Sequence, residues 1–207
     1  MEFIMDKALK TFSKSKINKI YSYNEYIREA EKFIENSNSR DLSEQDKIYY
    51  DYTKINLQRS SRIEKTFKPN NEIVELLKKI DTSQTWLFIT EAWCGDSAQN
   101  IPYFFEYSKF NNNIKVILIL RDSNIEAIDN YFTEGNSRSI PKIVFFDSNG
   151  NELARWGSRP KFAQDLVQQL KAEGYTKEEF NKELHTWYAK NRGKELEKEI
   201  LEIFKSF

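Results

Sequence analysis

The stretch TWLFITEAWCGDSAQNIP, residues 85 to 102, decides the fold of this chain. Its first part, 85–90, is an unalternated apolar run, which is typical of a strand that is covered on both faces of a sheet. A second run of this kind, IKVILIL, occupies 114–120, and the segment 95–109 between them predicts a crossover helix. The order strand, helix, strand indicates an α/β fold with a parallel strand pair.

The remaining segments extend this pattern on both sides. The sequence IPKIVFFDSNGNELARWG, 140–157, predicts two strands joined by a hairpin, because Asn-Gly is the strongest short hairpin signal. Five other segments carry helical spacing or helix start signals. They are 23–36, Ser43 to about Arg62, Ser123 to about Phe132, Pro160 to about Ala172, and a long C-terminal helix from Thr176 whose apolar stripe includes Phe180, Leu184, Trp187 and Tyr188.

A boundary falls at the segment KPNN, 68–71, where proline and asparagine interrupt the helical pattern. We therefore expect an N-terminal helical extension over 1–68, an α/β domain over 69–173 and a C-terminal helix over 174–207. The α/β domain is expected to contain a mixed four-stranded sheet with flanking helices.

Composition limits the function. Lysine and arginine balance aspartate and glutamate, 32 against 32, so the chain lacks the net positive charge of a nucleic-acid binder. The single cysteine cannot form an internal disulfide, which suits a reducing cytoplasm. We expect no signal peptide, membrane span, metal site or phosphate-binding glycine loop, because none of these patterns occurs in the sequence. Function must then come from a site around the cysteine.

The motif WCGDS, 93–97, resembles the active-site loop of the thioredoxin family, in which Trp-Cys-x-x-Cys lies between a strand and a helix. Pro102 matches the proline inside the active-site helix of that family. Ile140-Pro141 matches its cis-proline, and Gly157 follows the hairpin as expected. The resemblance covers about 70–172, and the whole chain looks most like a bacterial thioredoxin-like group that carries WCGD and a helical N-terminal extension.

The resemblance implies that Cys94 is a catalytic nucleophile. A helix N-terminus stabilises an anion, so we expect the pKa of this thiol to be lowered. Asp96 should oppose the thiolate only weakly if it is solvated, and Ser97, on the facing side of the helix turn, could donate a hydrogen bond to the sulfur. The residues that the resemblance assigns to substrate binding are Trp93, Gly95, Asp96, Ile140 and Pro141.

Two departures from the family pattern remove the dithiol cycle. Ser97 stands where thioredoxins have the resolving cysteine, and Phe88 stands where they keep a buried acid. Release of a mixed disulfide would then need a partner's cysteine or an external thiol such as glutathione, with no resident cofactor. The sequence thus predicts a cytoplasmic monothiol oxidoreductase that acts on protein or small-molecule disulfides, and it does not indicate the oligomeric state.

Several alternatives stay open at this point. Cys94 could be a buried structural thiol, and the domain could be a redox-inactive binding or chaperone-like module that keeps the thioredoxin docking groove. His185, the only histidine, lies beside the apolar stripe of its helix and is interpreted as a solvated surface residue. Arg59, Arg62 and Lys65 could either bind an acidic thiol or form a solvated helix face.

Overall fold

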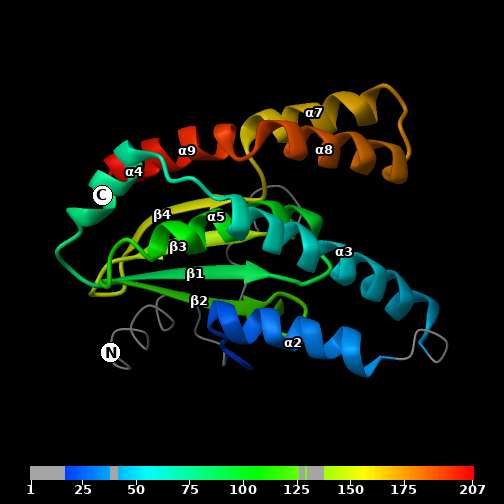
Figure 1. Ribbon diagram of the computed structural model, residues 1–207, viewed down its shortest axis with the longest axis horizontal. Coiled ribbons are helices and arrows are strands. Elements are labelled where there is room, and N and C mark those ends of the chain that lie inside the picture. The colour runs from blue at the N-terminus through cyan, green and yellow to red at the C-terminus, as the bar shows by residue number, and fades with distance from the viewer. Residues whose placement is uncertain (1–16, 38–41, 126–128, 130–137) are drawn as a thin grey trace.

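The computed structural model describes residues 17–37, 42–125, 129 and 138–207. Its centre is a four-stranded sheet in the order β2-β1-β3-β4, and Figure 1 shows helices stacked above it. The strands are β1 Gln84–Thr90, β2 Ile114–Leu120, β3 Lys142–Phe146 and β4 Glu152–Gly157. The helices are α2 Tyr23–Asn36, α3 Glu44–Thr66, α4 Asn71–Lys78, α5 Gly95–Ser108, α7 Lys161–Ala172, α8 Lys177–Asn191 and α9 Lys194–Lys205.

Strand β1 is one of the two inner strands of the sheet, as its apolar sequence predicts, whereas β2 lies at an edge although its sequence is equally apolar. Strand β1 pairs in parallel with β2, where Phe88 lies opposite Leu118, and antiparallel with β3, where Phe88 lies opposite Ile143. Every residue of β1 is buried. Strands β3 and β4 form the predicted hairpin, and Gly150 in its turn has a φ of 84°. The expectation of a mixed four-stranded sheet with flanking helices is confirmed.

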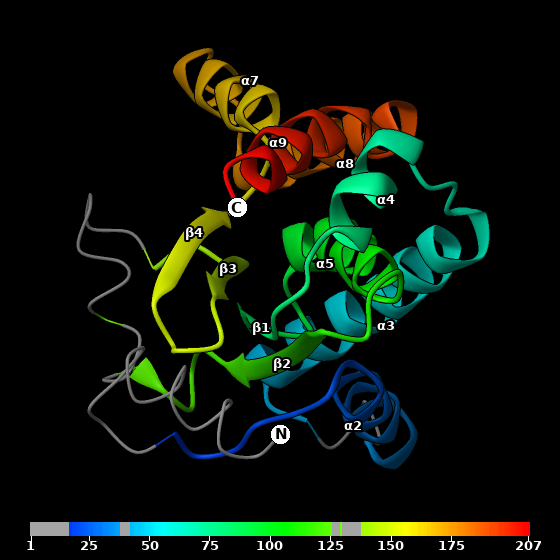
Figure 2. The same ribbon diagram turned by 90° about the vertical axis from the view of Figure 1, so that its left-hand side faces the viewer.

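The main core lies between one face of the sheet and the helices. Helix α5 crosses this face, and Figure 2 shows α4 and α9 on the same side. Aromatic rings dominate the packing: Trp86 of β1 contacts Phe145 of β3 edge to face and stacks on Phe204 of α9, in each case with ring centroids 5.2 Å apart. Rings of this size bury much apolar area, so this face supplies most of the packing energy.

The opposite face of the sheet has a smaller apolar cluster. Leu87, Ile89 and Val144 point into it, and Ile17 and Ile20 from the chain before α2 pack against it. The same segment is held to the sheet by a bridge between Tyr21 and Leu118. The helix that we predicted from Ser123 to about Phe132 lies largely outside the described residues.

The N-terminal helices begin at polar caps. Ser22 forms a capping box with Glu25, and the Ser43 side chain accepts a hydrogen bond from the Asp46 N–H. Helix α3 then packs along α5, so the extension lies against the active-site helix of the α/β domain. After the break at 68–71 the structure adds α4, which the sequence analysis did not predict. Asn70 caps it, and it packs against α9.

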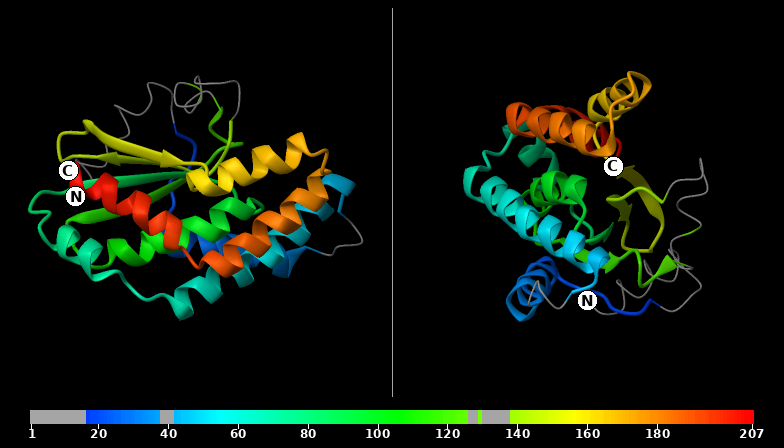
Figure 3. Two further views of the ribbon diagram at one scale, coloured as in Figure 1. Left: turned by 90° about the horizontal axis from the view of Figure 1, so that it is seen from above. Right: turned by 90° about the vertical axis from the view of Figure 1, so that its right-hand side faces the viewer.

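The expected single C-terminal helix is wrong, because α8 and α9 are separate. Arg192 and Gly193 both adopt left-handed conformations, with φ of 53° and 81°, and the chain turns between the two helices. Helix α9 packs into the main core through Leu196, Ile200 and Phe204. Helix α8 instead pairs with α7 in a separate apolar cluster, and Figure 3 shows this pair beside α3 at one end of the molecule.

No helix in the described part of the chain has the length and apolar character needed to cross a membrane.

Replacing Gly193 tests the break between α8 and α9. We expect Gly193→Ala to lower the free energy of unfolding by more than Gly174→Ala does, although both glycines are left-handed. A Cβ at 193 would lie 2.5 Å from the Tyr103 ring, whereas at 174 it would meet nothing within 4 Å. Left-handed strain alone costs about 1 kcal/mol, and the clash adds to it. Urea unfolding of both variants measures the difference, and equal losses would contradict this packing.

Candidate functional site

The site lies where β1 ends and α5 begins. Cys94 is the N-cap residue of α5, and its N–H donates to the Glu91 carbonyl at 3.0 Å. The Ile140–Pro141 peptide bond, just before β3, is cis and lies opposite the cysteine. The Cys94 Sγ donates a hydrogen bond to the Ile140 carbonyl oxygen at 3.3 Å. The structure therefore brings together the motif cysteine and the proline loop, which are far apart in the sequence.

Gly157, the last residue of β4, packs directly against the backbone of Pro141. It has a φ of 125°, which favours glycine, and a Cβ at this position would overlap the carbonyl oxygen of Pro141. Ser139 and Ile140 of this loop line the cavity described below, whereas Pro141 is buried and does not. The end of β4 can approach the loop closely only because residue 157 has no side chain.

Cys94 is a protonated, buried thiol in this structure. Its exposed fraction is 8%, and burial raises its pKa to about 11, with a further contribution from the negative charge of Asp96. The Ser97 hydroxyl and the backbone N–H groups of Asp96 and Ser97 favour the thiolate, but their combined effect is smaller. The expected lowering of this pKa is therefore wrong, because loss of solvent outweighs the helix N-terminus.

Asp96 differs most from its predicted surroundings. We expected a solvated carboxylate, but its side chain is 9% exposed and pairs with the Arg159 Nη2 at 2.5 Å. The Tyr188 hydroxyl of α8 donates to its other oxygen at 2.7 Å, and Asn100 donates to the same hydroxyl at 3.0 Å. Burial raises the pKa of Asp96, and Arg159 opposes that rise. The carboxylate thus joins α5 to α8 and to the loop before α7.

The Ser97 hydroxyl lies close enough to the sulfur to favour its thiolate, but it makes no hydrogen bond to the neutral thiol. The exposed fraction of Ser97 is 1%, and its hydroxyl has no hydrogen-bond partner among the described residues. It lies within the first turn of α5 and does not line the cavity next to Cys94. A hydroxyl in this place can donate to a nearby anion, so the predicted bond to a Cys94 thiolate stays a prediction.

Trp93 is held between two other side chains. Its ring stacks on Tyr49 of α3, with centroids 5.1 Å apart, and the Arg121 guanidinium lies 5.0 Å from its centroid. The ring is half-buried and lines the cavity next to Cys94. Trp93 therefore forms part of the wall beside the cysteine, and α3 of the N-terminal extension holds it there.

His185 belongs to the site, and its interpretation as a solvated surface residue is wrong. A Cβ on Gly95 would lie 2.6 Å from the imidazole, so the ring sits directly on the backbone at the start of α5. Gln99 Nε2 and the His185 Nδ1 are 3.4 Å apart. Burial, with the charges of Arg59 and Arg159, lowers the pKa of His185 to about 3, so the ring is neutral near pH 7.

A cavity of about 280 Å³ connects these residues to solvent. Cys94, Gly95, Asp96 and Ile140 form its floor, and α8 and α3 supply walls. Its lining carries one carboxylate, that of Asp96. The cations around it are Arg59, Arg121, Arg159, Lys171 and Lys177.

Four side chains of this region were missed by sequence reasoning. Arg159 and Tyr188 bind Asp96, His185 covers Gly95, and Glu91 is buried with its carboxylate accepting the Asp122 N–H at 2.8 Å. Only Glu91 had a usable signal, since it lies two residues before the motif WCGDS. The other three lie in segments that dock on α5, and the local periodicity of a sequence does not predict such docking. No three metal-ligating side chains cluster within the part of the chain that the structure describes.

Two buried titratable groups here have opposite effects on stability. His185 binds a proton only in the unfolded state between about pH 3 and its unfolded pKa near 6.5, so it makes stability rise with pH in that window. The pKa of Glu91 is raised from 4.5 to about 7 by burial, so this group binds a proton only in the folded state between those values. It makes stability fall as pH rises.

We therefore expect the two variants His185→Gln and Glu91→Gln to differ in pH dependence. Relative to the unsubstituted protein, His185→Gln should lose stability as pH rises from 5 to 6.5, by up to about 1.4 kcal/mol per pH unit. Glu91→Gln should gain stability over the same range by a similar amount. Urea unfolding at several pH values measures both trends. Parallel curves for the three proteins would show that neither group is perturbed.

The chain is similar to one protein family and to solved structures. A family model described as Thioredoxin matches residues 42–171, which is more than half of the chain. The crystal structure of a protein of unknown function from Pseudomonas aeruginosa superimposes with a TM-score of 0.51 at 18% identity, covering 89% of this chain and 98% of the other. An HIV epitope-scaffold gives 0.49 at 18% identity, over 90% of this chain and 99% of the other.

The first of these structures shares the fold, and at this identity it shows no more than that. No curated protein matches the chain. The family model covers α3, the sheet and α7, and thus the whole segment that contains the motif cysteine and the cis-proline. This chain belongs to the thioredoxin family.

Proposed function

We propose that this protein is a monothiol thiol–disulfide oxidoreductase that reacts through Cys94. The thiolate of Cys94 would attack one sulfur of a disulfide, forming a mixed disulfide and releasing the other sulfur as a thiolate. A single observation carries the proposal: Cys94 lies at the N-terminus of α5, faces the Ile140 carbonyl and borders a cavity.

The second half of the cycle requires another molecule, because the sequence contains one cysteine. An external thiol would attack the mixed disulfide and return Cys94 to its reduced form. Glutathione, another low-molecular-weight thiol or a partner's cysteine has the necessary chemistry. A reducing cytoplasm supplies such thiols, so we propose a cytoplasmic location. The substrates would be disulfides of proteins or small molecules.

The geometry also supports a way for substrate to dock. In the resting structure the Cys94 thiol uses the Ile140 carbonyl as its hydrogen-bond acceptor. Once the sulfur enters a mixed disulfide it has no proton to donate, and the carbonyl becomes free to accept an N–H from an extended substrate backbone. Trp93, Gly95 and the proline loop would then border the bound segment. Asp96 would act indirectly, by positioning the start of α5.

Because its pKa is raised, the resting Cys94 thiol reacts slowly with disulfides near pH 7. With a pKa of about 11, roughly one molecule in ten thousand carries a thiolate at pH 7. The same observation favours a second candidate function, a redox-inactive thioredoxin-fold module that binds partners through the same cavity. The two candidates differ in whether partner capture needs the sulfur.

The alkylation rate of Cys94 by iodoacetamide should report this pKa directly. In the folded protein the rate should keep rising with pH beyond 9, towards a midpoint near 11. Asp96→Asn removes a negative charge next to the sulfur and leaves the Arg159 cation uncompensated, so it should lower the pKa of Cys94. We expect alkylation at pH 8 to accelerate several-fold, up to roughly tenfold for one pKa unit.

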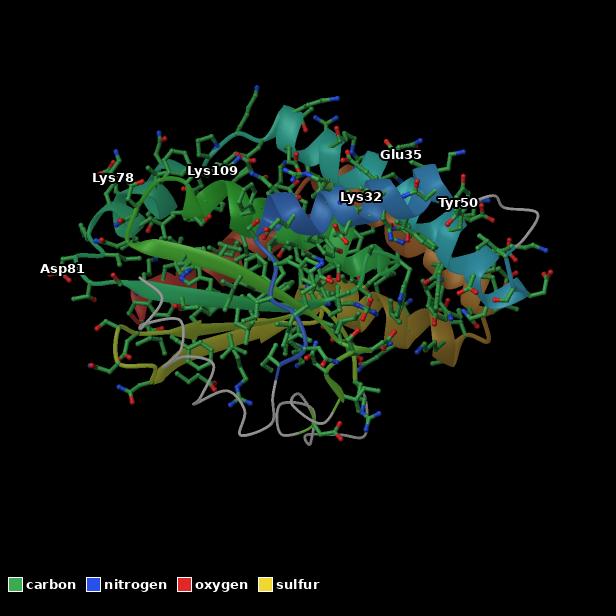
Figure 4. All side chains as sticks on the ribbon, turned by 90° about the horizontal axis from the view of Figure 1, so that it is seen from below. Lys32, Glu35, Tyr50, Lys78, Asp81 and Lys109 are labelled. Atoms are coloured by element: carbon green, nitrogen blue, oxygen red, sulfur yellow. The ribbon has the colours of Figure 1, made fainter. Side chains whose placement is uncertain are left out.

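Asp81→Asn is the matched control, since it makes the same chemical change on an exposed residue. Figure 4 shows Asp81 at the opposite end of the molecule from Tyr50 of α3. The control should leave the alkylation rate unchanged. A midpoint below 8.5 in the unsubstituted protein would show that the thiol is already activated and that burial does not govern it.

Exposure to oxidised glutathione tests the exchange step. We expect a stable mixed disulfide on Cys94, visible as one added glutathione in the intact mass, and release by reduced thiol. Cys94→Ser cannot form it, and Ser97→Ala should slow its formation if that hydroxyl steadies the thiolate. If the folded protein forms no adduct and Cys94→Ser still binds its partners, the oxidoreductase function is wrong. The redox-inactive binding module would then be the better description.

A further inference from the structure

A second hollow adjoins the Cys94 cavity and continues away from it. It is a groove of about 870 Å³ between α3 and α8, with Gln99 of α5 on its floor. The groove and the Cys94 cavity share wall residues, so a bound chain can pass from one to the other. The shared residues are Tyr52, Arg59, Lys177, Asn181 and His185.

The charge of this groove differs from the charge of the chain as a whole. The chain has no net charge, yet the groove wall carries a single carboxylate, that of Glu178. Opposing it are five cations. They are Arg59 and Arg62 from α3, and Lys177, Lys182 and Lys190 from α8.

These cations lack acidic partners within the described residues. Arg59 donates to the Asn56 side chain at 2.9 Å, and Arg62 reaches the Gln99 side chain at 3.4 Å, so both bind neutral oxygens. The lysines at 182 and 190 are exposed. Deeper in, Arg159 pairs with Asp96 through one nitrogen, while its buried Nε has no hydrogen-bond partner among the described residues. Unpaired positive charge along one concave surface attracts an anionic ligand.

The length of the groove indicates the kind of anion. Lys177 and Lys190 lie about 20 Å apart along the axis of α8, at roughly 1.5 Å per residue. An extended polypeptide spans that distance with roughly six residues. A small acidic thiol would fill only the part nearest Cys94, leaving Lys182 and Lys190 without a contact. A polypeptide also fits the chemistry, since its cysteine could enter the Cys94 cavity while its neighbours occupy the groove.

We propose that the α3–α8 groove binds an extended acidic polypeptide segment and delivers it to Cys94. The delivery step rests on the proposed function, because it assumes that Cys94 reacts with the bound segment. The binding itself does not require the sulfur. The specificity comes from carboxylates on the segment that pair with the lysines of α8 and with Arg59 and Arg62. His185 is neutral near pH 7, so the positive charge of the groove comes from its arginines and lysines.

Fluorescence anisotropy with labelled, cysteine-free peptides tests the binding on the full chain. A glutamate-rich peptide should bind, a lysine-rich peptide of equal length should not, and added salt should weaken the complex. The double variant Lys182→Glu, Lys190→Glu should bind the acidic peptide at least roughly tenfold more weakly. The control variant Lys54→Glu, Lys79→Glu makes the same charge change on exposed residues outside the groove and should bind normally.

Four outcomes would overturn the proposal. They are equal binding by the two double variants, preference for the basic peptide, displacement of the acidic peptide by free glutathione at an equal concentration of carboxylate, and tighter binding of a single-stranded oligonucleotide of similar length. Binding should persist in Cys94→Ser. Failure of the groove therefore appears in the anisotropy, whereas failure of the oxidoreductase function appears only in the mixed-disulfide mass.

Discussion

A single buried carboxylate, that of Asp96, holds the functional end of this molecule together. It sits in the first turn of α5, receives hydrogen bonds from Arg159 and Tyr188, and so ties three segments to one point. A buried charge of this kind is tolerated only when it is paired and hydrogen-bonded. The same arrangement docks α8 on the start of α5, where His185 lies against Gly95 and is kept neutral by burial.

The same carboxylate sets the chemistry of the thiol in two ways. Directly, its charge disfavours a thiolate two residues away. Indirectly, by docking α8, it helps remove Cys94 from solvent, which is the larger effect on the pKa. Thioredoxin-fold chemistry normally relies on an anion at a helix N-terminus. In this protein the Asp96 carboxylate also lies at the N-terminus of α5. A Cys94 thiolate and the Asp96 carboxylate would therefore place two negative charges at one helix end.

The sequence was informative where local pattern controls structure. The apolar runs located β1 and β2, the Asn-Gly turn located the β3–β4 hairpin, and the WCGDS motif with Ile140-Pro141 located the two halves of the site. It failed where distant segments dock. Periodicity placed His185 beside an apolar stripe, but it could not show that this side of α8 rests on Gly95. Helix α4 was missed because it is short. The break at Arg192-Gly193 was missed because the residues on both sides of the glycine have helical character.

The separation of α8 from α9 has a consequence for which surfaces of this protein tolerate substitution. Helix α9 is embedded in the main aromatic core, whereas α7 and α8 share a small cluster of their own around Ala163, Val167 and Leu184. Substitutions on the outer faces of α7 and α8 can therefore accumulate without disturbing the packing of the sheet. The surface that α7 and α8 present can thus change while the sheet and its aromatic core keep the fold.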